Sequence, residues 1–299
     1  VNGVAISPDG KTIYAATQTT IFRVSYHAGD QTEPDASAQA IAHVRTGSIA
    51  PHSDGDVHTT TSVGVTTTTV YVGIGSSCNA CTEVDASRAA IWAMNPDGTA
   101  FHQIATRIRN PIALAIDPAS NALWAGGAGQ DALAKGHPYE YMDDVTAHGS
   151  SIADYGWPEC EEDHHAYTAG TNCATTVAPL VEFPAYATHI GAAFYPANEA
   201  GTYAFPAAYR GGLFVTSHGS WHSGPSTPPN VAFVAMTGDA PRTAVNWNDP
   251  TAQWQPFMTG FGTTSSTQYI GRPTGVAVGA QGSLFVADGD NGVIYRIRP

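Results

Sequence analysis

Three observations in the sequence predict an all-β fold, a β-propeller of four-stranded antiparallel blades. The chain repeats one unit: a short apolar strand, a turn rich in Gly, Asp or Asn, and a second apolar strand. The inner strands are nearly continuous apolar runs, as in strands buried on both faces. No segment keeps an amphipathic helix period over three turns. Over 299 residues, such repeats favour radially stacked blades, with a β-sandwich as the structural alternative.

Five copies of the repeat can be traced. The three clearest copies are residues 2–17, 111–126 and 273–288. Two weaker copies pair residues 62–66 with 70–74 and residues 191–195 with 212–216. The sequence therefore predicts five repeat units within a single propeller domain that spans residues 1–299.

The two ends of the chain complete their units differently. Third strands are predicted at residues 20–24 and 292–297, so the last unit has three strands. The chain starts directly on an inner strand, and we expect an N-terminal strand or blade in the precursor. Long insertions, residues 130–179 and 218–261, each follow the second strand of a unit. We expect both to form loops on one face, around the central channel.

Composition excludes several partners. The net charge of −13, with only Lys11 and Lys135 as lysines, argues against nucleic acid, because phosphate binding needs clustered Lys and Arg. It equally disfavours an anionic membrane surface. The sequence has no run of 18 apolar residues, so no membrane insertion is predicted.

Four cysteines form two sequence-local pairs, Cys78 with Cys81 and Cys160 with Cys173. The second pair lacks the tight spacing of a zinc knuckle, and a redox Cys-x-x-Cys would need a βαβ context. We therefore predict two local disulfides, with zinc ligation and free thiols as alternatives. Disulfides imply an oxidising compartment, so the protein is expected to be secreted or periplasmic.

A few polar residues stand next to the predicted inner strands. His58 precedes one of them, and histidine is the side chain best suited to accept a proton near neutral pH, although a lone histidine is more often a surface or packing residue. Arg109 and Arg272 stand at equivalent strand starts. They predict either an anionic ligand or pairing with loop carboxylates. Trp221 is either a stacking platform for a planar ligand or a lid on the core.

Two further segments are interpreted as structural. Residues 154–158, with Gly156 before Trp157-Pro158, are typical of a tight turn. His164 and His165 lie in a loop rich in Asp and Glu, where we expect them to be solvated rather than bound to a metal.

Taken together, the motifs resemble the soluble quinoprotein sugar dehydrogenases, the glucose/sorbosone and aldose sugar dehydrogenase family that uses pyrroloquinoline quinone (PQQ). The pieces occur in the family's order and roughly its spacing over most of the chain. They are His58, residues 70–79, residues 107–110, residues 123–131, residues 155–158, residues 218–221 and residues 271–273.

The resemblance implies a six-bladed propeller with the quinone over the central channel. His58 matches the family's general base, and Arg109 matches the arginine beside the quinone oxygens. The backbone carbonyls of Ala128 and Gly129 match those that hold a calcium ion. The other positions implied to contact the cofactor are Ser76, Ser77, Asn110, Asp131, His218, Trp221 and Arg272.

The implied activity is the oxidation of the anomeric carbon of aldose sugars to lactones, with hydride transfer to calcium-bound PQQ and an external electron acceptor. Several cations of the family pattern are absent here; for example, His222-Ser223 stands in place of Asn-Arg. This motivates one alternative, a propeller that binds a ligand without the cofactor. A metal-dependent lactonase is the other; it would require several carboxylates to converge on a channel metal.

Overall fold

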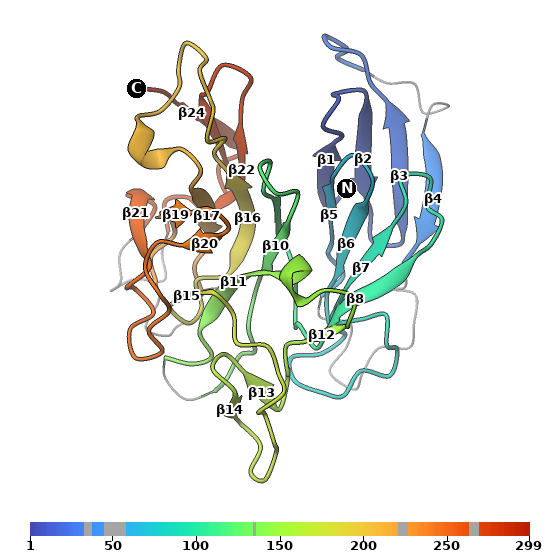
Figure 1. Ribbon diagram of the computed structural model, residues 1–299, viewed down its shortest axis with the longest axis vertical. Coiled ribbons are helices and arrows are strands. Elements are labelled where there is room, and N and C mark those ends of the chain that lie inside the picture. The colour runs from blue at the N-terminus through green and yellow to red at the C-terminus, as the bar shows by residue number, and fades with distance from the viewer. Residues whose placement is uncertain (33–37, 45–57, 134–135, 221–226, 263–268) are drawn as a thin grey trace. The chain divides into compact units, whose positions relative to one another are not determined.

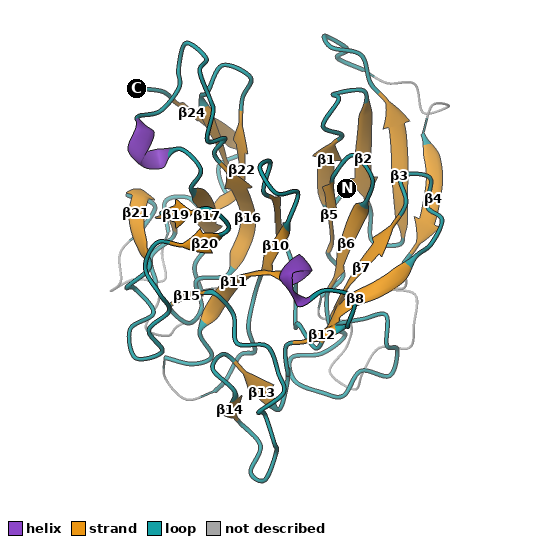
Figure 2. Ribbon diagram, in the orientation of Figure 1, coloured by secondary structure: helices purple, strands orange, loops and turns teal. Residues whose placement is uncertain are grey.

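The computed structural model describes residues 1–32, 38–44, 58–133, 136–220, 227–262 and 269–299. Figures 1 and 2 show that the described chain is almost entirely strand and loop, with two short 3-10 helices, η2 (Val145–His148) and η3 (Ala207–Tyr209). Among these described residues no helix is long and apolar enough to cross a membrane. The chain divides into two compact units, residues 1–116 with 145–177 and residues 117–144 with 178–299.

The first two sheets lie in the first unit. The order of the first sheet is β1-β2-β3-β4, and that of the second is β12-β8-β7-β6-β5. The strands are β1 (Gly3–Ile6), β2 (Thr12–Ala16), β3 (Thr20–Ser25), β4 (Gln39–His43), β5 (Thr61–Val65), β6 (Val70–Ile74), β7 (Ala90–Met94), β8 (His102–Thr106) and β12 (Ala153–Asp154).

The remaining blades are one sheet in the order β15-β11-β10-β9, one in the order β16-β17-β18-β21, and a three-stranded sheet, β22-β23-β24. Small hairpins β13-β14 and β19-β20 accompany them. The strands are β9 (Ala113–Ile116), β10 (Leu123–Gly126), β11 (Glu140–Asp144), β13 (Cys160–Glu161), β14 (His165–Ala166), β15 (Val181–Phe183), β16 (His189–Phe194), β17 (Leu213–Ser217), β18 (Asn230–Val234), β19 (Met236–Thr237), β20 (Ala240–Pro241), β21 (Trp254–Met258), β22 (Pro273–Val278), β23 (Leu284–Asp288) and β24 (Val293–Ile297).

The predicted fold class is confirmed: the described residues form five propeller blades of mainly antiparallel strands, and each predicted repeat is the first hairpin of one blade. The described residues thus form the five units traced in the sequence and not the six blades that the family resemblance implies. Hairpin β5–β6 illustrates why. Its register runs from Thr61 opposite Ile74 to Val65 opposite Val70, and the Thr66 hydroxyl organises the turn between the strands. The last blade has three strands, as the sequence predicts.

Three expectations need correction. The long insertions are not only loops: the first contains β11, the third strand of its blade, and the second contains β18 and β21. β11 lacks an apolar pattern because it is rich in acidic residues, and β18 and β21 are separated by a long polar connection. Burial on both faces holds for β5, β6 and β17, but not for β1, where Val4 is 63% exposed and Ile6 is 50% exposed. The blades are also not purely antiparallel, since β12 pairs with β8 in parallel.

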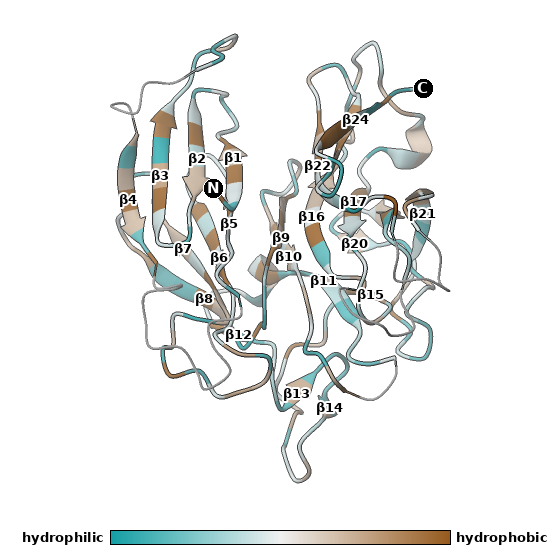
Figure 3. Cartoon of the chain, turned by 180° about the vertical axis from the view of Figure 1, so that it is seen from behind, coloured by the Kyte–Doolittle hydropathy of each residue, from teal (hydrophilic) through white to brown (hydrophobic). Residues whose placement is uncertain are grey.

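Each unit has its own hydrophobic core. In the first unit, valine and isoleucine side chains of β5 and β6 pack with Tyr14 and Ile21 from the neighbouring sheet. In the second unit, the core is aromatic and centres on Phe214, which contacts the rings of Tyr195, Phe205 and Phe233. Figure 3 shows hydrophobic bands alternating with hydrophilic ones along β3, in which Ile21 is buried and Ser25 is exposed.

His189 begins β16, and its side chain is fully buried. Burial lowers the pKa of His189 to about 3, because an imidazolium would lose its hydration; a contact with the Thr216 backbone opposes this only in part. The folded-state pKa therefore lies below the value near 6.5 of an unfolded histidine. The contribution of His189 to the free energy of unfolding is therefore fully present above pH 6.5. It falls at lower pH, because His189 becomes protonated in the unfolded chain but stays neutral in the folded chain.

We expect a His189→Gln variant to lack this acid sensitivity. Each pH unit below 6.5 costs the parent about 1.4 kcal/mol of unfolding free energy through this one group. Urea unfolding at pH 6.5 and pH 4 should show the parent losing about 3 kcal/mol more than the variant. His102→Gln, at an exposed position, is the control and should behave as the parent. Equal losses in the parent and in His189→Gln would contradict the assignment.

Candidate functional site

Three segments of the first unit meet where β6 ends: residues 58–60 before β5, residues 75–81 after β6, and residues 107–111 between β8 and β9. The Ser76 N–H donates to the Arg109 carbonyl at 2.8 Å, and the His58 N–H donates to the Ser76 carbonyl at 3.2 Å. The Thr60 hydroxyl donates to Asn110 Oδ1 at 3.3 Å. The structure therefore brings together four of the predicted site residues, His58, Ser76, Arg109 and Asn110.

Gly75 allows this approach. A Cβ atom at Gly75 would lie 2.6 Å from Asn110 Oδ1 and 2.6 Å from the His58 Cβ. Real Cβ atoms do not come this close to other atoms, so a larger residue would push the two side chains apart.

The hydrogen bonds of His58 assign its proton. Nδ1 lies 2.7 Å from the Ser76 hydroxyl and 3.2 Å from the Ser76 carbonyl oxygen. A carbonyl only accepts, and the Ser76 hydroxyl gives its hydrogen to the Cys78 carbonyl at 2.7 Å. Nδ1 must therefore carry the hydrogen, so the neutral ring keeps its lone pair on Nε2. A histidine in this tautomer can accept a proton at Nε2.

Arg88 is a buried residue that binds the same segment, and the sequence motifs did not predict it. It is 3% exposed. Its Nε–H donates to the Gly75 carbonyl at 2.7 Å, and Nη2 donates to the His58 carbonyl at 3.0 Å. Nothing in the local sequence distinguishes Arg88 from a surface arginine, because its role depends on two carbonyls far away in the chain.

Arg109 is buried at 5% exposure and is held by the loop after β6. Its Nε–H donates to the Asn79 carbonyl at 3.0 Å, and Nη2 donates to Asn79 Oδ1 at 2.8 Å. The Trp157 indole N–H donates to the same Asn79 carbonyl at 3.1 Å. Arg107, on the same segment, instead forms ion pairs with Asp154 at 3.2 Å and Glu159 at 2.7 Å. Arg107 therefore stabilises the predicted turn at residues 154–158.

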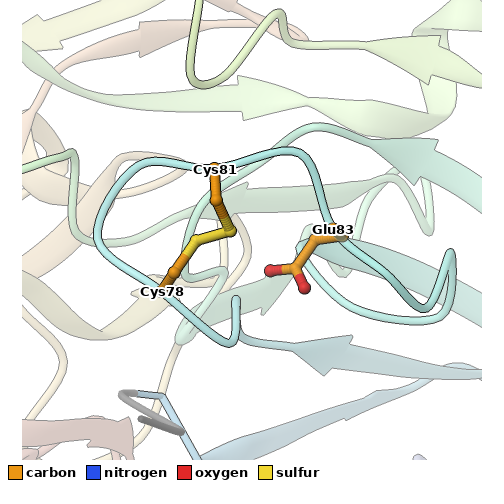
Figure 4. A group of neighbouring side chains, drawn as sticks. All are labelled: Cys78, Cys81 and Glu83. Carbon is orange, nitrogen blue, oxygen red and sulfur yellow. A yellow bond between two sulfur atoms is a disulfide. The ribbon is translucent and has the colours of Figure 1, made fainter. Parts of the chain in front are cut away.

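The loop that holds Asn79 is closed by a disulfide between Cys78 and Cys81, shown in Figure 4. Cys160 and Cys173 form the second disulfide, and no cysteine is free. The prediction of two local disulfides is confirmed, and the zinc and free-thiol alternatives are wrong. Glu83 lies beside the first disulfide in Figure 4, but sulfurs bound to each other are not thiolate ligands.

Ser77, which is predicted to contact the cofactor, contacts Glu83 in this structure. Its N–H and its hydroxyl each donate to a Glu83 carboxylate oxygen at 2.7 Å. A hollow of about 550 Å³ lies beside this loop, lined in part by Cys81, Glu83, Arg107 and Trp157. Glu83 and Arg107 are already held by other groups, so their arrangement stabilises the loop rather than specifying a ligand.

The other predicted site residues belong to the second unit. Ala128 and Gly129 follow β10, and the Gly129 N–H donates to Glu140 Oε2 at 3.1 Å. Glu140, on β11, is 4% exposed and was not predicted. Asp131 lies in the following turn and is half-buried. Backbone carbonyl and carboxylate oxygens are the kind of hard ligand that suits Ca²⁺.

Arg272 and His218 contact each other in the second unit. Arg272 Nη1 lies 3.1 Å from His218 Nδ1, and since a guanidinium only donates, Nδ1 accepts. Burial lowers the pKa of His218, and the Arg272 charge lowers it further. Arg272 also pairs with Asp290 at 3.5 Å and lies over the Tyr269 ring. The pairing with a loop carboxylate is thus present at Arg272. Trp221 lies outside the described residues.

We expect a Gly75→Ala variant to lose most of the activity of this site. The added methyl group would displace His58 and Asn110, and a displacement of about 1 Å can reduce turnover on the order of 100-fold. Gly275→Ala is the control, because its new Cβ would make an ordinary contact of 3.6 Å with Ala287. Steady-state kinetics on both variants test this, and full activity in Gly75→Ala would contradict it.

The family follows from comparison with known proteins. The TrAA12-like family model matches residues 1–166 and 161–299. The chain belongs to the TrAA12-like family. No curated protein sequence matches it. The resemblance to soluble quinoprotein sugar dehydrogenases is thereby confirmed at the level of family.

Solved structures share the fold of this TrAA12-like chain. An AA12 carbohydrate-active enzyme of Trichoderma reesei has a TM-score of 0.79 at 20% identity, covering 98% of this chain and 79% of that one. The holo PQQ domain of pyranose dehydrogenase from Coprinopsis cinerea has a TM-score of 0.77 at 16% identity, covering 99% of this chain and 81% of that one. The apo soluble aldose sugar dehydrogenase of Escherichia coli has a TM-score of 0.57 at 15% identity, covering 95% of this chain and 73% of that one. At these identities the three structures show that the chain shares their fold.

Proposed function

We propose that this TrAA12-like chain is a quinoprotein dehydrogenase that oxidises the anomeric carbon of aldose sugars to lactones, with calcium-bound PQQ as its cofactor. One observation carries the proposal: His58 is held by Ser76 as a base with its lone pair on Nε2, one hydrogen-bonded segment away from the buried Arg109. Solved structures that share its fold include a PQQ domain and an aldose sugar dehydrogenase.

Each unit, taken by itself, offers groups of the kind that such a cofactor needs. PQQ is planar and carries three carboxylates, and the buried Arg109 beside Asn110 provides a cation and an amide of the kind that bind an anionic group. Ala128 and Gly129, with Glu140 bonded to the Gly129 N–H, provide oxygen atoms suited to Ca²⁺. When bound, the quinone supplies the acceptor for a hydride, and calcium polarises it as a Lewis acid.

The chain's own residues would then handle the proton and the charge. His58 Nε2 takes the proton from the anomeric hydroxyl as that carbon gives up its hydride, so the sugar loses two electrons and two hydrogens and becomes the lactone. Ser76 keeps the imidazole oriented through Nδ1. Arg109 places a fixed positive charge where negative charge develops, which stabilises the transition state without reorganisation.

The experiment that tests this function adds PQQ and Ca²⁺ to the purified protein and measures sugar-dependent dye reduction together with the cofactor's absorption spectrum. Bound quinone with turnover supports the proposal. Absence of both overturns it. Lactone hydrolysis without quinone would instead favour the lactonase, and sugar binding without quinone would favour the cofactor-free binding module. The two disulfides support a secreted or periplasmic location, where an external acceptor would reoxidise the cofactor.

A further inference from the structure

The loop closed by the Cys78–Cys81 disulfide contains a polar residue that none of the sequence motifs singled out for a role. Asn79 presents two oxygens to one guanidinium: its carbonyl accepts from Arg109 Nε–H, and Oδ1 accepts from Nη2. Two parallel bonds from the same edge of a guanidinium fix both its position and the orientation of its plane. Asn79 therefore contributes more than a filled hydrogen bond.

The two oxygens that Asn79 offers to Arg109 are neutral, unlike the carboxylate oxygens that bind Arg107. Arg107 is held by the carboxylates of Asp154 and Glu159, which offset its charge. An amide accepts the same two hydrogen bonds but adds no negative charge. The contacts with Asn79 thus orient the Arg109 guanidinium and themselves add no negative charge.

The disulfide holds the Asn79 carbonyl in place. Cys78 and Cys81 are joined across only three sequence positions, which confines the two residues between them. Cys78 is fully buried and packs with Ala89 and Trp157. Trp157 donates its indole N–H to the Asn79 carbonyl, so that oxygen is fixed from a second direction.

We propose that Asn79 is a positioning residue for Arg109, and that the Cys78–Cys81 disulfide keeps Asn79 in the required geometry. The inference rests on the proposed function only for its effect on turnover. The contact itself can be measured in the protein without cofactor.

The test compares Asn79→Ala, Asn79→Asp and the control Asn95→Ala, which changes an exposed turn asparagine bonded to Thr99. The readout without cofactor is the ¹⁵N–¹H signal of the Arg109 Nε–H, assigned by its disappearance in Arg109→Lys. We expect this signal to shift or broaden in Asn79→Ala and to stay in place in Asn95→Ala. An unmoved signal in Asn79→Ala would overturn the proposal, whether or not the chain oxidises sugars.

In the cofactor-loaded protein, Asn79→Ala should lower kcat about tenfold with an unchanged KM for the sugar, the effect of losing one hydrogen bond to a charged group. Asn79→Asp keeps both acceptors but offsets the guanidinium charge, so it should weaken quinone binding about tenfold. If Asn79→Asp kept the parental quinone affinity and kcat, the neutrality of Asn79 would not matter, and the role assigned to its lack of charge would be overturned.

The disulfide is tested by Cys78→Ala/Cys81→Ala, which should reproduce the Arg109 signal of Asn79→Ala. Its matched control is Cys160→Ala/Cys173→Ala, which removes the other disulfide and should leave the signal in place. If the first double variant does not fold, mild reduction of the Cys160→Ala/Cys173→Ala protein reports on the remaining disulfide. A signal that survives reduction would overturn the role of the disulfide.

Discussion

Replacing His58 by alanine should leave quinone and calcium binding intact and reduce sugar turnover by roughly 10²- to 10⁴-fold, the usual contribution of a positioned general base. The reason is local. Nδ1 of His58 is bonded to Ser76, so Nε2 is the ring nitrogen that can take the proton. Stopped-flow measurement of cofactor reduction by sugar, with quinone binding measured separately, provides the test.

His102→Ala is the matched control for this result. His102 is an exposed histidine on β8 whose Nδ1 contacts the Ala100 carbonyl at 2.7 Å. It should retain parental rates. If His58→Ala also retained them, His58 would have no role in proton transfer, and the proposed mechanism would be rejected even if the protein binds PQQ.

The second large effect is expected at Arg109. In Arg109→Ala we predict a loss of about 10²- to 10³-fold in kcat/KM, comparable with removing a preorganised group that stabilises developing negative charge. Arg109→Lys should recover only part of the loss, because an ammonium keeps the charge but not the paired donors that face Asn79. Titration with PQQ and steady-state kinetics would separate the effect on binding from the effect on turnover.

Arg23→Ala serves as the control for Arg109, since Arg23 bonds Gln39 at the exposed surface of β3 and β4. Arg23→Ala should leave both the affinity for PQQ and kcat/KM unchanged. Thermal unfolding of all three variants guards against a trivial loss of folded protein. Parental kinetics in Arg109→Ala would contradict the assignment of Arg109 to the site.

Much of this molecule could be predicted from local patterns. The short apolar runs and the turn residues located the hairpins, as at β5–β6, because both signals depend on neighbours in sequence. The same holds for the disulfides, whose partners are three and thirteen positions apart. The long insertion after β10 was harder. Its strand β11 is short and rich in acidic residues, and it pairs only because β10 and β15 accept it.

The candidate site likewise contains residues that the sequence could predict and contacts that it could not. Motif spacing was sufficient to select His58 and Arg109, since each lies beside a recognisable strand. Other features of the site could be found only in the three-dimensional structure. They are the proton position on His58, the carbonyls that bind Arg88, the hydrogen bond between Glu140 and Gly129, and the two hydrogen bonds from Arg109 to Asn79. Each of these is a hydrogen bond between segments that lie at least ten residues apart or that meet through a folded loop. Such bonds depend on distance and direction in space, which residue identity along the chain does not encode.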